Sequence, residues 1–154
     1  MLGAISNPKK TLAIDFSIEK IKSTIEFIPL LNSKYKFSSK NDILNSYIFE
    51  ALEFLSLGIF ADISLSKLDD KRTEITIEIR RKIGAFDEAH EVSRANDHIA
   101  AIFELISKCI VLSENEILEL EAKKKSAPDK KGCMVAVLMT IGSLLGGSLL
   151  YAMT

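Results

Sequence analysis

The feature that most restricts the fold of this chain is an alternation between residues 59 and 79 in which every second residue of two segments is apolar and the residues between them, apart from Phe60, are polar. The alternation is interrupted once, at Asp69 and Asp70. Period-two alternation on both sides of a polar turn predicts a β-hairpin with one wet and one dry face. The dry face consists of Ile59, Ala61, Ile63, Leu65, Ile75, Ile77 and Ile79. Such a face must be covered by another layer, so the chain is expected to fold around a covered antiparallel sheet.

Shorter segments indicate the other strands of this sheet. Residues 11–16 read as a first strand, and Tyr35 and Phe37 alternate with polar neighbours in a second. Residues 43–57 are apolar almost throughout, which leaves strand and helix open. Their aromatic and β-branched content favours a strand. Gly84 is expected to close the hairpin's second strand.

Two segments have helical spacing. After a predicted N-cap at Ser17, apolar residues recur up to Ile28, and Pro29 and Asn32 are expected to end that helix. A longer helix near the end of the domain carries an apolar stripe, which would cover the sheet. Its members are Ile99, Ile102, Phe103, Ile106, Cys109 and Ile110. Ser113 and Glu116 then form a capping box that opens another helical stretch through Glu121. The predicted class is α+β, with roughly four or five antiparallel strands under a long C-terminal helix.

The C-terminal tail predicts a membrane anchor. Residues 132–153 carry no charged side chain. A helix of roughly 22 residues is about 33 Å long, enough for a hydrocarbon core of about 30 Å. We therefore expect an N-terminal arm at residues 1–10, an α+β domain at 11–121, a lysine-rich linker at 122–131 and a transmembrane helix at 132–154.

The lysines that precede this span predict its orientation. They are Lys123, Lys124, Lys125, Lys130 and Lys131. Basic residues close to a span favour the cytoplasmic side, so we expect a single-pass protein of the cell membrane with a cytoplasmic N-terminal domain and its C-terminus on the opposite side. The same lysines would contact anionic lipid headgroups. The alternative, a solvated linker, is compatible with that role.

Small residues within the span predict helix–helix packing. Gly142 and Gly146 stand four residues apart, as do Ser143 and Gly147. This spacing lets a second helix approach closely. The expected partner is an integral membrane protein or a second copy of this chain. The alternative is that glycine is simply frequent in membrane helices.

Residues able to catalyse a reaction or bind a metal are sparse. Both histidines, His90 and His98, lie near Asp87 and Glu91, a set that could in principle ligate a metal. Their spacing matches no known ligand frame, so a polar loop that caps the last helix near Ser93 or Asn96 is favoured, and no cofactor is expected. Cys109 falls on an apolar face and no serine lies in a nucleophile-elbow motif, so no catalytic residue is predicted.

The charge balance argues against a nucleic-acid partner. The formal net charge is −1, from 20 basic and 21 acidic residues. The basic run Arg80-Arg81-Lys82 lacks accompanying aromatic residues, unlike typical nucleic-acid surfaces. It could contact acidic lipid or a partner, although short charge runs are more often solvated.

Taken together, residues 11–28, the strands from Tyr35 to Ile83 and the helix around Ile99–Ile110 resemble a reduced START-like (SRPBCC, helix-grip) domain. The hairpin from Gly58 to Ile83, with its segment Thr73–Glu78 (TEITIE), is particularly similar. The resemblance implies a lipid or other apolar ligand held between the sheet and the long helix. A bacterial PH-like domain, which also has strands followed by a helix, is the main structural alternative.

Three functions follow from these observations. The first is a non-enzymatic membrane-anchored module, a small accessory or assembly subunit of a larger membrane protein complex. The second is lipid or apolar-ligand binding by a START-like domain tethered to the membrane. The third is an enzyme that uses the cluster from Asp87 to His98.

Overall fold

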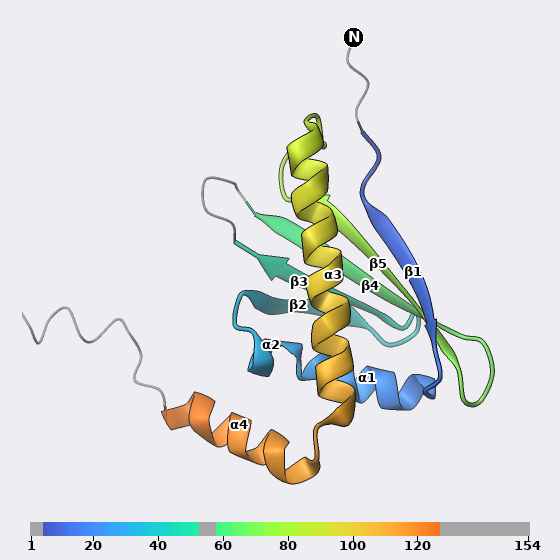
Figure 1. Cartoon of the computed structure of the whole chain (residues 1–154), viewed down its shortest axis with the longest axis vertical. Coiled ribbons are helices and arrows are strands. Elements are labelled where there is room, and N and C mark those ends of the chain that lie inside the picture. Colours follow the sequence, from blue (N-terminus) through green and yellow to red (C-terminus); the bar gives the residue numbers. More distant parts are fainter. Residues whose placement is uncertain (1–4, 53–57, 127–154) are drawn as a thin grey trace, which may run out of the picture. The chain divides into compact units, whose positions relative to one another are not determined.

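The structure is a computed structural model that describes residues 5–52 and 58–126. Five strands and three of the helices lie within one compact unit, Met1–Leu120 (Figure 1). In chain order the elements are β1 (Lys9–Ile14), α1 (Ile18–Glu26), α2 (Ile28–Leu31), β2 (Tyr35–Asn41), β3 (Ser46–Ala51), β4 (Ile59–Lys67), β5 (Thr73–Arg81), α3 (Ala89–Val111) and α4 (Glu114–Ser126).

The strands form one antiparallel sheet in the order β1-β5-β4-β3-β2. The predicted hairpin is confirmed as β4 and β5, whose register places Ile63 opposite Ile77. The first strand returns to the far side of this hairpin and pairs with β5, so that Leu12 lies opposite Ile75. The sheet therefore has β1 at one edge and β2 at the other.

One face of the sheet is the dry face that the alternation predicted. All seven of its predicted members in β4 and β5 are buried. Tyr47, Phe49 and Ala51 of β3 extend the same buried face. The opposite face carries mostly polar and charged side chains at the alternate positions, with Ile48 and Phe60 as apolar exceptions in β3 and β4, as expected for a sheet that is covered on one side.

Helix α3 runs across this dry face (Figure 1). Four members of the predicted stripe, Ile99, Ile102, Ile106 and Cys109, are buried, and Phe103 and Ile110 pack against the core from its margin. Leu105, which the prediction omitted, is buried as well. The sheet, α1, α2 and α3 thus share a single hydrophobic core.

The first helical segment differs from its prediction in two details. Ser17 occupies the N-cap position, but its side chain makes no capping hydrogen bond. Pro29 does not end the helix: α1 stops at Glu26, and Pro29 lies in the first turn of the short helix α2. A first helical turn tolerates proline because its backbone N–H groups have no intrahelical partner.

The ambiguous segment 43–57 is a strand in its middle part. Residues 42–45 form a turn instead, with Asn45 at a positive φ of 47°. The side chain of Asn41 accepts hydrogen bonds from the backbone N–H groups of Ile43 and Leu44, which leaves both of these side chains exposed. Residues 53–57 lie outside the described residues.

The capping box of Ser113 and Glu116 is confirmed at the start of α4. The Ser113 N–H and hydroxyl both donate to the Glu116 carboxylate, at 2.8 and 2.7 Å. The helix extends beyond Glu121 to Ser126, so Lys123, Lys124 and Lys125 lie in its last turn rather than in an extended linker. Acidic residues in the first turn and lysines in the last turn both suit the helix dipole.

The predicted transmembrane helix at 132–154, with its glycine pairs, and Lys130 and Lys131 lie outside the described residues. Among the helices that the structure does describe, none has the length and apolar character needed to cross a membrane.

Two glycines with positive φ provide a matched test of this backbone. A Cβ on Gly58, which has φ +91°, would lie 2.6 Å from the carbonyl oxygen of Ala51, whereas one on Gly84, with φ +76°, meets nothing within 4 Å. Gly84→Ala should cost about 1–2 kcal/mol of unfolding free energy from backbone strain alone. Gly58→Ala should cost at least about 1 kcal/mol more, because a backbone carbonyl must move. Urea unfolding measures both losses, and equal losses would contradict the close approach of β3 to Gly58.

Candidate functional site

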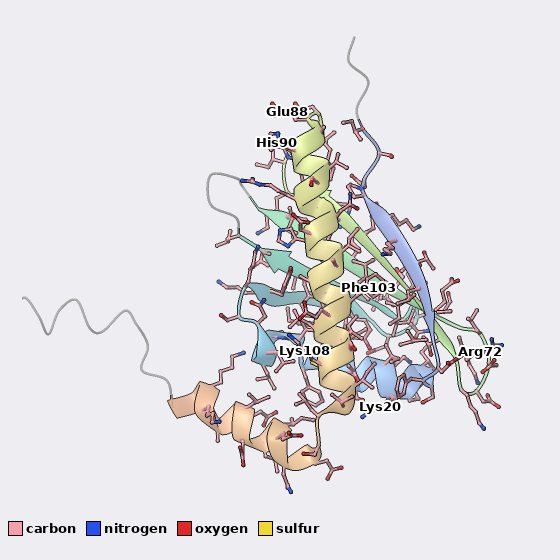
Figure 2. All side chains as sticks on the ribbon, viewed as in Figure 1. Lys20, Arg72, Glu88, His90, Phe103 and Lys108 are labelled. Carbon is pink, nitrogen blue, oxygen red and sulfur yellow. The ribbon has the colours of Figure 1, made fainter. Side chains whose placement is uncertain are left out.

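The predicted histidine cluster is not brought together. Helix α3 begins at Ala89 with Glu88 at the N-cap, so the predicted start near Ser93 or Asn96 is wrong and both histidines lie on one helix. Because each residue turns a helix by about 100°, side chains eight residues apart point in directions that differ by about 80°. His90 is exposed near the first turn, with Nδ1 2.8 Å from a Glu88 carboxylate oxygen (Figure 2). His98 is buried and 4% exposed. Val92, in the turn before Ser93, packs against the core, which favours the earlier start.

The carboxylates of this cluster hold the start of α3 to the end of β5. Arg81 Nη1 lies 3.0 Å from the Glu91 carboxylate and 3.6 Å from that of Asp87. The same nitrogen also donates to the carbonyl of Ala85. Over the described part of the chain, no group of three or more His, Cys, Asp or Glu side chains is placed to hold a metal ion. The arrangement therefore assigns Asp87 and Glu91 a structural role.

The basic run at the end of β5 is largely neutralised by its neighbours. Arg80 forms a two-bond ion pair with Asp62 on β4, and Lys82 Nζ donates to Glu50 on β3 at 2.6 Å. The hydrogen bond from Lys82 lowers the pKa of Glu50. Both cations also lie over the ring of Phe60, at 5.5 and 5.3 Å from its centroid. Arg80 and Lys82 are thus part of the polar face of the sheet, whereas Arg81 faces the start of α3.

His98 has a specific partner that sequence reasoning missed. The hydroxyl of Tyr35, the first residue of β2, lies 2.9 Å from His98 Nδ1, and the two rings meet edge to face at 5.7 Å between centroids. Both side chains are at least 96% buried. The apolar stripe of α3 could have predicted that His98 is buried. His98 stands four residues before Ile102 and so falls on the apolar face of the helix.

A polar pocket opens beside this pair. Its volume is about 330 Å³. Its lining residues come from the start of β2 and from the N-terminal half of α3: Lys34, Tyr35, Arg94, Asp97, His98 and Ala101. Buried hydrogen-bonding groups form its inner part, and charged side chains form its rim.

An apolar groove lies on the other flank of α3, against β1. Its volume is about 170 Å³. Phe103 marks its position midway along α3 (Figure 2). The walls are Leu12, Ile14 and Phe16 from the first strand and its end, Ile75 from β5, and Phe103, Ile106, Ser107 and Ile110 from α3. Seven of these eight side chains are apolar, so the groove suits an apolar ligand rather than catalysis.

Sequence and pairing explain why this groove stays open. Leu12 lies directly opposite the buried Ile75 and therefore shares the core face of the sheet. It is nevertheless 45% exposed, and Phe16 is 41% exposed. The Thr73 hydroxyl donates to the carbonyl of Phe16 at 2.8 Å and fixes the end of this wall. The core face thus continues beyond the edge of α3.

The comparisons with known proteins give information on the fold and not on the function. No protein-family model and no curated protein matches the chain. Among solved structures, CalU16 from Micromonospora echinospora matches with a TM-score of 0.50 and 9% identity over 74% of this chain and 81% of that one. A START superfamily protein from Mycobacterium smegmatis matches with a TM-score of 0.36 and 13% identity over 74% and 98%. The Zhui aromatase/cyclase from Streptomyces sp. R1128 matches with a TM-score of 0.35 and 11% identity over 80% and 98%.

The similarity to CalU16 supports a shared fold, while the other two scores are too low to carry an argument of their own. One of the three proteins is named as an enzyme. Because one fold hosts many activities, function must be argued from the pockets.

Cys109 is excluded as a nucleophile by its surroundings. It is buried in the core, and this burial raises the pKa of its thiol from 9.0 to about 11. The thiol is therefore protonated at neutral pH, whereas a reactive cysteine needs the thiolate.

The raised pKa of Cys109 predicts a loss of stability in alkali. Above the unfolded pKa the unfolded thiol ionises while the folded thiol keeps its proton, so the unfolding free energy falls as pH rises toward the folded value. The difference in stability between the wild type and Cys109→Ala should shrink by roughly 2 kcal/mol between about pH 8 and about pH 11. Urea unfolding at several pH values measures this difference, and a constant value would contradict the assigned shift.

Proposed function

We propose that the α+β domain binds a small apolar ligand in the groove between β1 and α3. The observation that supports this proposal is the groove's wall of seven apolar side chains around one hydroxyl, Ser107. An apolar ligand would remove Leu12 and Phe16 from water, and each buried methylene contributes about 0.8 kcal/mol. The proposal agrees with the ligand position that the START-like resemblance implies.

The size of the groove limits the ligand. Its volume of about 170 Å³ is below the roughly 300–1,000 Å³ of typical drug-sized sites. An apolar cavity of about 150 Å³ is known to hold benzene, so one aromatic ring or a short acyl segment fits here. Any larger ligand would have to extend out of the groove.

A groove of this size implies modest affinity. Five or six buried methylenes contribute about 4–5 kcal/mol, and about 4 kcal/mol corresponds to a dissociation constant near 1 mM. Such a site works best where apolar ligand is concentrated, as it is in a bilayer. The proposed anchor at residues 132–154 would hold the domain at that surface.

Filling the groove should abolish ligand binding. Ser107→Trp places a large side chain at the groove, and the neutral single-ring probe benzyl alcohol should then bind at least about tenfold more weakly by NMR titration. Ser93→Trp is the matched control, because Ser93 is exposed on the same helix and lines neither pocket. The natural chain contains no tryptophan, so each variant carries the same single added tryptophan. Similar affinities for the two variants would overturn the assignment of the groove.

We also propose that the tail makes the chain an accessory subunit of a membrane complex, either with an integral membrane protein or with a second copy. This second candidate rests on the uncharged segment 132–153 and on its paired small residues. It does not compete with ligand binding, because the two roles use different parts of the chain.

Bulky residues at the small positions should prevent this assembly. Gly142→Leu combined with Gly146→Leu should abolish co-purification of the partner after mild solubilisation, because the helices can no longer approach closely. Val137→Leu combined with Ile141→Leu changes two positions on the opposite face of such a helix and should leave assembly intact. Undiminished co-purification of the glycine variant would contradict the proposal.

A further inference from the structure

We propose that the polar pocket on the second flank of α3 binds a small anion, a carboxylate or a phosphate group. The pocket, lined by Lys34, Tyr35, Arg94, Asp97, His98 and Ala101, has a volume of about 330 Å³. This volume accommodates a small metabolite-sized ligand. The proposal concerns a different site from the apolar groove and does not depend on it.

The inner part of the pocket is a rigid polar surface. Tyr35 and His98 are 2% and 4% exposed, and the hydrogen bond between the Tyr35 hydroxyl and His98 Nδ1 is 2.9 Å. A histidine on the buried face of α3 costs desolvation, and the phenol at the start of β2 offsets that cost. The pair thereby holds two side chains able to form hydrogen bonds at fixed positions beside the pocket.

The two cations at the rim line one pocket and form no ion pair within the described residues. Arg80, Arg81, Lys82 and Lys40 each form an ion pair with a neighbouring carboxylate. By contrast, within residues 5–52 and 58–126 neither Lys34 nor Arg94 forms an ion pair, although both line one pocket. Two cations that converge without an anionic partner make a favourable place for one.

The chemistry of the rim defines the class of ligand. The planar guanidinium of Arg94 can donate two parallel hydrogen bonds to a carboxylate or a phosphate, and Lys34 adds a mobile point charge. Asp97 is the one acidic residue among the lining residues, so the rim carries a net charge of about +1. Its carboxylate opposes the binding of a simple anion and would accept a hydrogen bond from a hydroxyl or ammonium group of a larger one.

The two pockets lie on opposite flanks of α3. At about 100° per residue, the mean direction of Arg94, Asp97, His98 and Ala101 differs by about half a turn from that of Phe103, Ile106, Ser107 and Ile110. The buried stripe of α3 lies between them. Substitutions in one pocket should therefore leave binding in the other unchanged.

The test is an NMR titration of the full-length chain in mild detergent, with inorganic phosphate and acetate as separate probes and sodium chloride as the ionic-strength control. Saturable shifts of the amides around Lys34, Arg94 and Asp97 are expected with at least one of the two probes. Arg94→Gln should weaken binding at least about tenfold. Asp97→Asn should strengthen it, because it removes the opposing charge.

Arg72→Gln is the matched control, since Arg72 is an exposed arginine in the β4–β5 turn, far from the pocket along the chain (Figure 2). It should bind the probe as the wild type does, and so should Ser107→Trp.

Tighter binding of phosphate than of acetate would indicate a phosphorylated ligand. Tighter binding of acetate would indicate a carboxylic acid. Equal binding by Arg94→Gln and Arg72→Gln, or shifts that sodium chloride reproduces, would overturn the proposal. All the substituted residues are exposed, so loss of folding is not expected to obscure the result.

Discussion

The packing of α3 against the dry face of the sheet is the contact on which the rest of the domain depends. A helix with its side chains is about 10 Å wide, whereas five strands spaced about 4.8 Å apart span about 19 Å. One helix therefore cannot cover the whole face. Helices α1 and α2 complete the core, and a margin of the face remains next to α3 at β1. The apolar groove is the direct consequence of this mismatch in width.

Charge distribution separates the two flanks of α3. On the polar face of the sheet and at the end of β5, basic side chains are matched by carboxylates across strands or on the next helix. These pairs are exposed to water to different degrees, and surface pairs of this kind contribute little to stability. Lys34 and Arg94 form no such pair within the described residues, and both line one pocket.

Much of the fold could be predicted because it follows from side-chain periodicity. The alternation in β4 and β5 and the stripe on α3 each specify a buried face, and both faces are observed. The segment at 43–57 could not be resolved locally, because its central residues become a strand by pairing with both β2 and β4. The predicted start of α3 was wrong because the packing of Val92 against the core outweighed the capping preferences of Ser93 and Asn96.

The sites were less predictable than the fold, for a physical reason. Each pocket is formed by residues far apart in the sequence, such as Tyr35 with His98, or Leu12 with Ile106. No spacing rule connects such residues until the strand order is known. Proximity in sequence instead suggested a cluster of Asp87, His90, Glu91 and His98. Its two histidines point in different directions once they lie on α3. The resemblance to START-like proteins implies a ligand between the sheet and the long helix, and the apolar groove lies between β1 and α3.

The central claim is that an apolar ligand lies between β1 and α3. The most direct measurement is a set of intermolecular NMR contacts between bound benzyl alcohol, a single-ring probe, and the methyl and aromatic groups of the full-length chain. The account predicts contacts to Leu12, Phe103 and Ile106 and none to Ala101 in the polar pocket. Contacts confined to other surfaces of the domain, or a saturated probe without contacts to β1 and α3, would contradict it.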